Sequence, residues 1–199
     1  MRLFFILFLL AFLLTNCKEI TVNKHLVEKT LVINSLEVEK KELTLNQIEG
    51  KWYFKEQPFN GYSIVFHSNG AIGERLGYYN GKREGIAKKW SDNGVVRVQS
   101  YYKQNRLEGV YKSWWENGVL AAESHYVNGV LNGVSKEWYA TGELAKERVL
   151  LDGKEDGLQR AWLQNGKLYV NYEAKNGRIF GMRRANSCYK LENEVVIKD

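Results

Sequence analysis

Basic and aromatic side chains recur at a fixed spacing in this sequence, and together they could bind anions. A Lys or Arg returns every 24 residues, in four of five cases two places before a Trp: Lys88 and Trp90, Lys112 and Trp114, Lys136 and Trp138, Arg160 and Trp162, and then Arg184. Cations attract lipid phosphates or acidic proteins, and indole rings add cation–π or stacking surface. The spacing therefore predicts a binding strip. The alternative is that the long basic side chains lie over the tryptophans and keep only their charges in water.

The remaining chemistry-bearing residues do not form a catalytic pattern. His25, His67 and His125 fall at unrelated places in the 24-residue period. They combine with no Ser, Cys or Asp at a spacing typical of a catalytic set, and no His/Cys/Asp cluster has metal-ligand spacing. The glycines mark turns rather than a phosphate-binding loop. We therefore expect no enzyme activity, no cofactor and no metal.

The 24-residue period governs most of the chain. Its clearest copy runs over 109–133, and the same place in each period is occupied by Gly61, Gly85, Gly109, Gly133, Gly157 and Gly181. A fixed period of this kind indicates a repeat array, in which each small unit stacks on its neighbours to bury apolar surface. Two turn signals recur in each period, as in Asn69-Gly70 and Asn80-Gly81. Because Asn-Gly between apolar runs is a strong hairpin signal, each period predicts two antiparallel strands.

The predicted fold is all-β: an elongated single-layer antiparallel β-meander of 24-residue hairpin repeats, with about 12 strands. A half-repeat with Ile48 and Phe54 is expected to open the array, and five full periods follow from Gly61. The apolar or aromatic places of the first period are 62, 66, 72 and 78. Because all are even, they share one face only if every loop has an odd number of residues. A three-residue loop with a left-handed Gly and a bulge meets this condition.

This register assigns residues to the two faces of the sheet. It places Val110, Lys112, Trp114, Leu120 and Tyr126 together, with Tyr126 opposite Val134, and leaves the other face mixed and solvated. The tryptophans are either the core of each repeat or a partly exposed interaction patch. The partners of the basic residues are mostly uncharged in this register, so that the charges stay unpaired: Val98 for Lys88, Ala122 for Lys112 and Val170 for Arg160.

The first residues have the layout of a secretory signal. Arg2 precedes an unbroken apolar run over 3–14, which is too short to span a bilayer as a helix. Cys17 follows Leu14-Thr15-Asn16 and resembles the lipobox of bacterial lipoproteins, although that motif usually has Gly, Ala or Ser directly before the Cys. We expect acylation of Cys17, which would hold the protein on a membrane. Ordinary signal cleavage, leaving a free Cys17, is the alternative.

Four regions follow from these features: a lipoprotein-type signal peptide over 1–16, a lipid-anchored tether over 17–45, the repeat array over 46–186 and a tail over 187–199. One or two strands can form near 30–39 of the tether. The predicted location is the bacterial cell envelope outside the cytoplasm, on the outer membrane or cell surface. The second cysteine, Cys188, then has no intrachain partner, so no structural disulfide is expected.

The repeated pattern Gly-apolar-x-Lys-x-Trp-x-x-Asn-Gly-x-apolar, followed by Tyr-x-x-Gly, resembles the variant MORN repeat. This repeat occurs in bacterial proteins grouped with the YwqK-type antitoxins. The resemblance covers roughly 48–182 and implies a meandering antiparallel sheet. It also implies contact with proteins and, less securely, with phospholipid headgroups. A YwqK-type antitoxin would neutralise a toxin by binding it, whereas the signal peptide and Cys17 indicate a place outside the cytoplasm.

These features predict a lipid-anchored interaction module that docks a protein partner without catalysis. Lys plus Arg exceed Asp plus Glu by 29 − 23 = 6, a mild basic balance that permits acidic partners and does not favour nucleic acid. Three alternatives stay open. The Lys/Trp strip could bind anionic lipid or polysaccharide, the array could space or stiffen a structure at the envelope, or the protein could neutralise a toxin.

Overall fold

A computed structural model describes residues 31–182, so the predicted signal peptide, Cys17, Arg184 and the C-terminal tail lie outside the described part. Its main sheet has 14 strands. In sheet order they are β1 (Glu37–Glu39), β5 (Gly61–Phe66), β6 (Ile72–Tyr79), β7 (Lys82–Trp90), β8 (Val96–Lys103), β10 (Gly109–Trp114), β11 (Leu120–Val127), β13 (Gly133–Trp138), β14 (Leu144–Leu151), β15 (Lys154–Trp162), β16 (Leu168–Lys175) and β17 (Arg178–Met182), with β9 (Arg106–Leu107) beside β8 and β12 (Val130–Leu131) beside β11.

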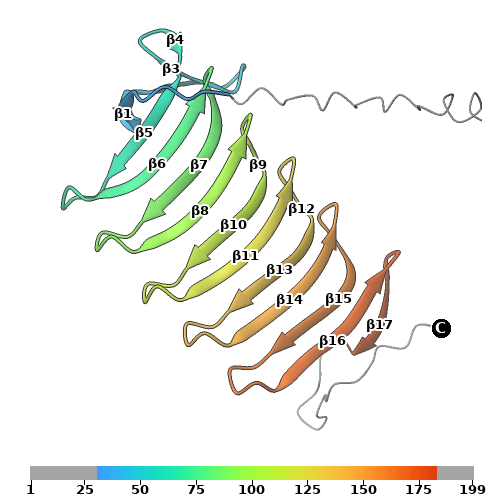
Figure 1. The fold of residues 1–199 in the computed structure, drawn as a ribbon. Coiled ribbons are helices and arrows are strands. Elements are labelled where there is room, and N and C mark those ends of the chain that lie inside the picture. The colour runs from blue at the N-terminus through green and yellow to red at the C-terminus, as the bar shows by residue number, and fades with distance from the viewer. Residues whose placement is uncertain (1–30, 183–199) are drawn as a thin grey trace, which may run out of the picture. The chain divides into compact units, whose positions relative to one another are not determined.

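From β5 to β17 each strand on this path pairs antiparallel with the next, in chain order (Figure 1). The predicted all-β meander of hairpin repeats is therefore confirmed. Within residues 31–182, no helix has the length and apolar character needed to cross a membrane.

The start of the array differs from the prediction. The expected half-repeat lies in a separate sheet of β2 (Thr44–Asn46), β3 (Lys51–Phe54) and β4 (Gln57–Pro58). Lys55 and Glu56 adopt positive φ angles of 47° and 64°, which turn β3 back onto β4 at once. The edge of the main sheet is taken instead by β1, which pairs with β5 in parallel. The prediction that Ile48 begins the array was wrong, because Ile48 lies in a turn and is 99% exposed.

The two sets of turns use loops of different length. At the first set, His67 N donates to the carbonyl of Ala71 at 2.8 Å and Gly70 has a φ of 83°, which confirms the predicted three-residue loop. At the second set, Tyr79 pairs directly with Lys82 across a two-residue loop. Positive φ at both loop residues is typical of a type I′ turn, which suits Asn-Gly. The prediction of odd loops throughout was therefore wrong.

A β-bulge in every three-residue hairpin changes the register. Trp114 pairs with Leu120 as predicted, but Ser113 pairs with Ala122, so Ala121 is an extra residue. The same shift occurs before Phe66, Trp90, Trp138 and Trp162. An extra residue reverses the alternation of side chains along a strand. Tyr126 consequently lies on the face opposite Trp114 and pairs with Leu131 of β12 rather than with Val134.

The two faces are accordingly a tryptophan face and a tyrosine face. On the tryptophan face of the β10–β11 hairpin lie Val110, Lys112, Trp114, Leu120 and Glu123, and on the tyrosine face Tyr111, Ser113, Ala122, Ser124 and Tyr126. The tyrosine face, which the sequence predicted to be solvated, holds many of the buried side chains of the described part, including Ser63, Leu76, Tyr78, Ser100, Ser135, Leu150, Gln159 and Tyr172. That prediction was wrong because it depended on the odd-loop register.

An apolar cluster closes the N-terminal end of the tyrosine face. The buried members are Val38, Leu43, Phe59, Leu76, Tyr78 and Ala87, and Trp52, Phe54 and Tyr102 pack against them. The Phe59 and Tyr78 ring centroids lie 5.6 Å apart. Aromatic pairs of this kind contribute about 0.5–1.5 kcal/mol beyond the area that they bury. The small sheet and the segment that contains the short 3-10 helix η1 (Lys40–Glu42) therefore pack against the first repeat and stabilise it.

Candidate functional site

The basic residues of the predicted strip that the structure describes lie in one row, which crosses ten neighbouring strands of the tryptophan face. We call it the charged row, and its successive members are Ile64, Arg75, Lys88, Gln99, Lys112, Glu123, Lys136, Glu147, Arg160 and Asn171. From β7 onward, basic residues come from one strand of each repeat and acidic or amide residues from the other, whereas the first hairpin contributes Ile64 and Arg75. The strip is therefore an alternating ladder rather than a line of cations.

Most of the charges in the second half of this row are paired. The Lys112 ammonium lies 3.0 Å from the Glu123 carboxylate. Lys136 lies 3.2 Å from Glu147, which also accepts a hydrogen bond from Arg160 on its other side. The predicted partners Ala122 and Val170 point to the opposite face, as does Val98, because the bulge shifts the register by one residue. The prediction that these charges are unpaired was therefore wrong for Lys112, Lys136 and Arg160.

Glu147 is the most enclosed carboxylate of the ladder, with 17% of its side chain exposed. Burial acts to raise its pKa, but the hydrogen bonds and charges of Arg160 and Lys136 outweigh burial and hold the pKa below its usual value. The carboxylate therefore stays ionised and forms ion pairs with two cations, Lys136 and Arg160.

Lys88 differs from the later lysines of the row. Its cross-strand neighbours are Gln99 and Arg75, and within residues 31–182 no carboxylate lies at ion-pair distance from it. Arg75 is itself paired with Glu37 at 2.8 Å, and its guanidinium lies 3.5 Å from the centroid of the Tyr62 ring. Lys88 is therefore the cation of the described row that has no carboxylate within ion-pair distance.

A second row runs beside the charged row, on the side away from the tryptophans and two residues along each strand. We call it the apolar row, and its successive members are Ile86, Tyr101, Val110, His125, Val134 and Val149. Ile86 pairs with Tyr101, Val110 with His125 and Val134 with Val149, and the registers of the intervening strands align these three pairs. Four of its members are well exposed: Ile86 at 55%, Tyr101 at 41%, Val110 at 47% and Val134 at 49%. Apolar side chains so exposed on adjacent strands are available to a partner.

The four tryptophans of the strip form a third row at the hairpin ends. Each pairs with an aliphatic residue across its hairpin: Trp90 with Val96, Trp114 with Leu120, Trp138 with Leu144 and Trp162 with Leu168. All four indoles are half-buried, and the Arg160 guanidinium lies 5.3 Å from the Trp162 ring centroid. The tryptophans thus contribute to the packing of each hairpin and keep part of their surface on the tryptophan face.

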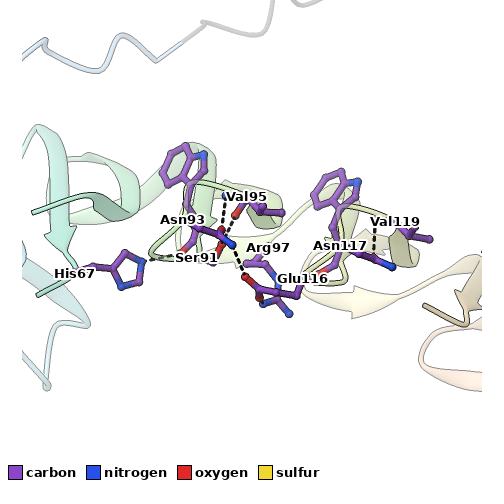
Figure 2. Close-up of polar contacts among 10 residues, drawn as sticks. His67, Ser91, Asn93, Val95, Arg97, Glu116, Asn117 and Val119 are labelled. Carbon is purple, nitrogen blue, oxygen red and sulfur yellow. Dashed lines mark hydrogen bonds and ion pairs between the residues drawn. The ribbon is translucent and has the colours of Figure 1, made fainter. Parts of the chain in front are cut away.

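Side-chain hydrogen bonds also link neighbouring repeats, and they were not predicted from the sequence. The main-chain carbonyl of each of these tryptophans accepts a hydrogen bond from the preceding repeat: from His67 Nε2 to Trp90 at 2.9 Å, Arg97 Nε to Trp114 at 2.9 Å, Trp115 Nε1 to Trp138 at 2.9 Å and Tyr139 Oη to Trp162 at 2.8 Å. Figure 2 shows His67 and Arg97 beside successive loops. Three of the donors directly follow the aromatic place of their own period, and this regularity could have revealed them.

Two hollows lie at the N-terminal end of the sheet, one on each face. The hollow on the tryptophan face has a volume of about 430 Å³ and is lined by Ile33, Tyr62, Arg75, Gly85, Ile86, Lys88 and Trp90. The hollow on the tyrosine face is smaller, about 270 Å³, and is lined by residues such as Arg83, Lys89, Tyr102 and Tyr111. Only the first contains members of the predicted strip.

The described side chains of the tryptophan face are suited to binding. Across residues 31–182, no three His, Cys, Asp or Glu side chains gather closely enough to hold a metal ion. What the tryptophan face offers is apolar surface, indole rings and an ordered series of charges.

Comparison with known proteins identifies the repeats. The family model described as MORN repeat variant matches residues 83–104, 107–128 and 131–149. These three segments are similar to the MORN repeat variant. A search of curated proteins found no match. The three matched segments are consecutive and lie within β7 to β14, and the hairpins β5–β6 and β15–β16 on either side of them repeat the same bulge and the same pairing. Repeat arrays of this kind often serve in binding.

Proposed function

We propose that this protein is a non-catalytic interaction module that binds a protein partner through its tryptophan face. The observation that carries the proposal is the exposed apolar row, in which Ile86, Tyr101, Val110 and Val134 lie on adjacent or nearby strands and each exposes more than 40% of its surface. Contiguous apolar surface on a folded protein typically marks an interaction site.

The surroundings of the apolar row support a protein as the partner. The charged row runs parallel to it along the sheet, so apolar surface is bordered by fixed charges of both signs. Protein interfaces commonly combine an apolar centre with a polar rim in this way. Alternating charges such as Lys112 and Glu123 would favour one register of the partner over others.

Binding to anionic lipid or polysaccharide is less well supported than protein binding. A charged membrane responds to the net charge of the surface that faces it. Glu123 and Glu147 offset much of the positive charge of Lys112, Lys136 and Arg160. The array as a spacer and the role of a YwqK-type antitoxin stay predictions, and the second rests on the resemblance of the repeats alone.

We also propose that the module is anchored outside the cytoplasm by acylation of Cys17. The support is the apolar run before Cys17 in the sequence. In cells supplied with a labelled fatty acid, the wild-type chain should incorporate the label and Cys17→Ala should not. Labelling of Cys17→Ala would contradict the anchor but would leave the partner proposal unaffected.

Site-specific photo-crosslinking tests the binding face. A benzophenone amino acid at Val110 on the tryptophan face should give a discrete crosslink to a protein in the native cell. The matched control is Val65, which is 39% exposed but lies on the tyrosine face. Crosslinking to the same protein from both sites, or from Val65 alone, would contradict the proposed face. Absence of any protein crosslink from Val110 would contradict a protein partner.

A further inference from the structure

The hollow beside Lys88 differs chemically from the rest of the tryptophan face. In later repeats the lysine of the charged row has a glutamate directly across the hairpin, as Glu123 for Lys112 and Glu147 for Lys136. The same place opposite Lys88 is Gln99. An amide carries no charge, so the position that holds a carboxylate in two later repeats lacks one here. The ammonium of Lys88 borders a hollow of about 430 Å³.

The walls of this hollow are mainly apolar. Trp90, Ile86 and Tyr62 line it, and Ile86 is more exposed than Tyr101, Val110 or Val134 of the apolar row. Ile33, from the segment before β1, already packs against this surface. A Cβ at Gly85 would lie only 3.0 Å from Ile33 Cδ1, and one at Gly77 only 2.8 Å. Two glycines thus leave room for an aliphatic side chain to lie flat on the sheet.

We propose that this hollow binds an acidic residue of the partner protein together with an adjacent apolar side chain. The partner carboxylate pairs with Lys88, as Glu123 pairs with Lys112 within the array. The apolar side chain packs between Ile86 and Trp90, beside Ile33. This inference rests on the proposed function, because it assigns the chemistry of one contact of the protein partner.

The charge of the hollow favours a carboxylate over a phosphate. A phosphate monoester carries close to two negative charges at neutral pH and is usually held by several cationic donors. Here the Arg75 guanidinium is engaged by Glu37 and stacks on Tyr62, which leaves Lys88 as the described cation of the row without an ion-pair partner. A single ammonium matches a single carboxylate.

Peptide titration followed by NMR tests this contact. The purified chain, labelled with ¹⁵N, is titrated with the peptide acetyl-Gly-Glu-Leu-Gly-amide, and the indole N–H signals are followed. We expect a shift of the Trp90 signal, at least tenfold weaker binding of the peptide in which Gln replaces Glu, and at least tenfold weaker binding to Lys88→Gln. Lys88→Arg should retain binding because it keeps the charge.

Lys89 provides the matched control. It neighbours Lys88 in sequence but lies on the tyrosine face, where it pairs with Glu74 at 2.9 Å. Lys89→Gln should bind the Glu peptide as the wild type does. Equal affinity for the Glu and Gln peptides, or equal losses in Lys88→Gln and Lys89→Gln, would overturn the inference. So would retention on phosphatidylglycerol vesicles that depends on Lys88 and is not competed by the peptide. If the photo-crosslinking experiment at Val110 still gave a protein crosslink, the proposal of a protein partner would stand and only this inference would fail.

Discussion

Lys112 and Glu123 face each other across β10 and β11, with the ammonium nitrogen 3.0 Å from a carboxylate oxygen. This pair exists because Ala121 is an extra residue in β11, which shifts the pairing of all residues beyond it by one position. Without the bulge Lys112 would face Ala122, and the tryptophan face would carry a line of unpaired cations. A one-residue irregularity thus decides the electrostatic character of the binding surface.

The first prediction concerns the energy of this pair. A double-mutant cycle with Lys112→Ala and Glu123→Ala should give a coupling free energy of about 0.2–1 kcal/mol, because both side chains are partly exposed and screened by water. The coupling should fall in 1 M salt. Urea unfolding of the four chains measures it. Lys88→Ala with Gln99→Ala, at the same place one repeat earlier, should show no salt-dependent coupling. A coupling free energy of zero for Lys112 and Glu123 would contradict the stabilisation expected of the ion pair.

The second prediction concerns pH. Because the pKa of Glu147 is depressed in the folded state, its ionised form contributes stability above the unfolded pKa, which is about 4.3. That contribution is lost as the pH falls through the lower folded value. Glu147→Gln should therefore lower the free energy of unfolding by about 1 kcal/mol at pH 7, with a difference that shrinks toward pH 3. Denaturation at several pH values checks this.

Glu123→Gln serves as the control for that experiment. Glu123 has one cationic partner and 43% of its side chain exposed, against two partners and 17% for Glu147. Its replacement should cost less than that of Glu147. Equal losses would show that the second partner, Arg160, adds nothing.

The third prediction concerns the hydrogen bonds between repeats. The Tyr139 hydroxyl donates to the Trp162 carbonyl at 2.8 Å. Tyr139→Phe removes the donor without changing the ring and should lower the free energy of unfolding by about 1 kcal/mol. The Tyr101 hydroxyl has no such partner among the described residues, so Tyr101→Phe should be nearly neutral. Thermal unfolding that fails to separate the two variants would contradict a structural role for the carbonyl contact.

The fourth prediction concerns Lys40 in the N-terminal cluster. Its ammonium lies 3.1 Å from the Trp52 ring centroid and donates a hydrogen bond to the Tyr78 hydroxyl. Burial, with a smaller effect of the Arg83 charge, lowers the pKa of Lys40 to about 8. Between pH 8 and about 10.4 the unfolded chain then binds more protons than the folded chain, so the free energy of unfolding should rise with pH in this window.

Lys40→Met should flatten that rise, which denaturation at pH 7.5 and 9.5 can measure. The matched control is Lys41→Met, one residue along, because the Lys41 ammonium is exposed and paired with Glu39. Hydrogen bonding to Glu39 raises the pKa of Lys41, so this group does not lose its proton in the same window. An identical pH dependence in wild type and Lys40→Met would contradict the effect of burial.

Sequence periodicity alone was enough to predict the architecture. Recurring Gly, aromatic and Asn-Gly places at 24-residue intervals indicate paired strands in chain order, because turn residues such as Gly70 and Asn80 have local conformational preferences that do not depend on the rest of the fold. The same periodicity located the strip from Lys88 to Arg160, and the structure does bring these residues into one row.

The faces and the pairing were decided only by the tertiary structure. Side chains alternate with a period of two, so any miscount of one residue moves a whole strand segment to the other face. Two features set this count, and the repeat pattern does not reveal either of them. One is the extra residue Ala121 at the bulge, and the other is the even number of residues in the loop Asn128-Gly129, where Asn128 has a φ of 52°. Neither leaves a mark in the 24-residue spacing. Whether Lys112 meets Ala122 or Glu123 is therefore set by the hydrogen-bond register between strands.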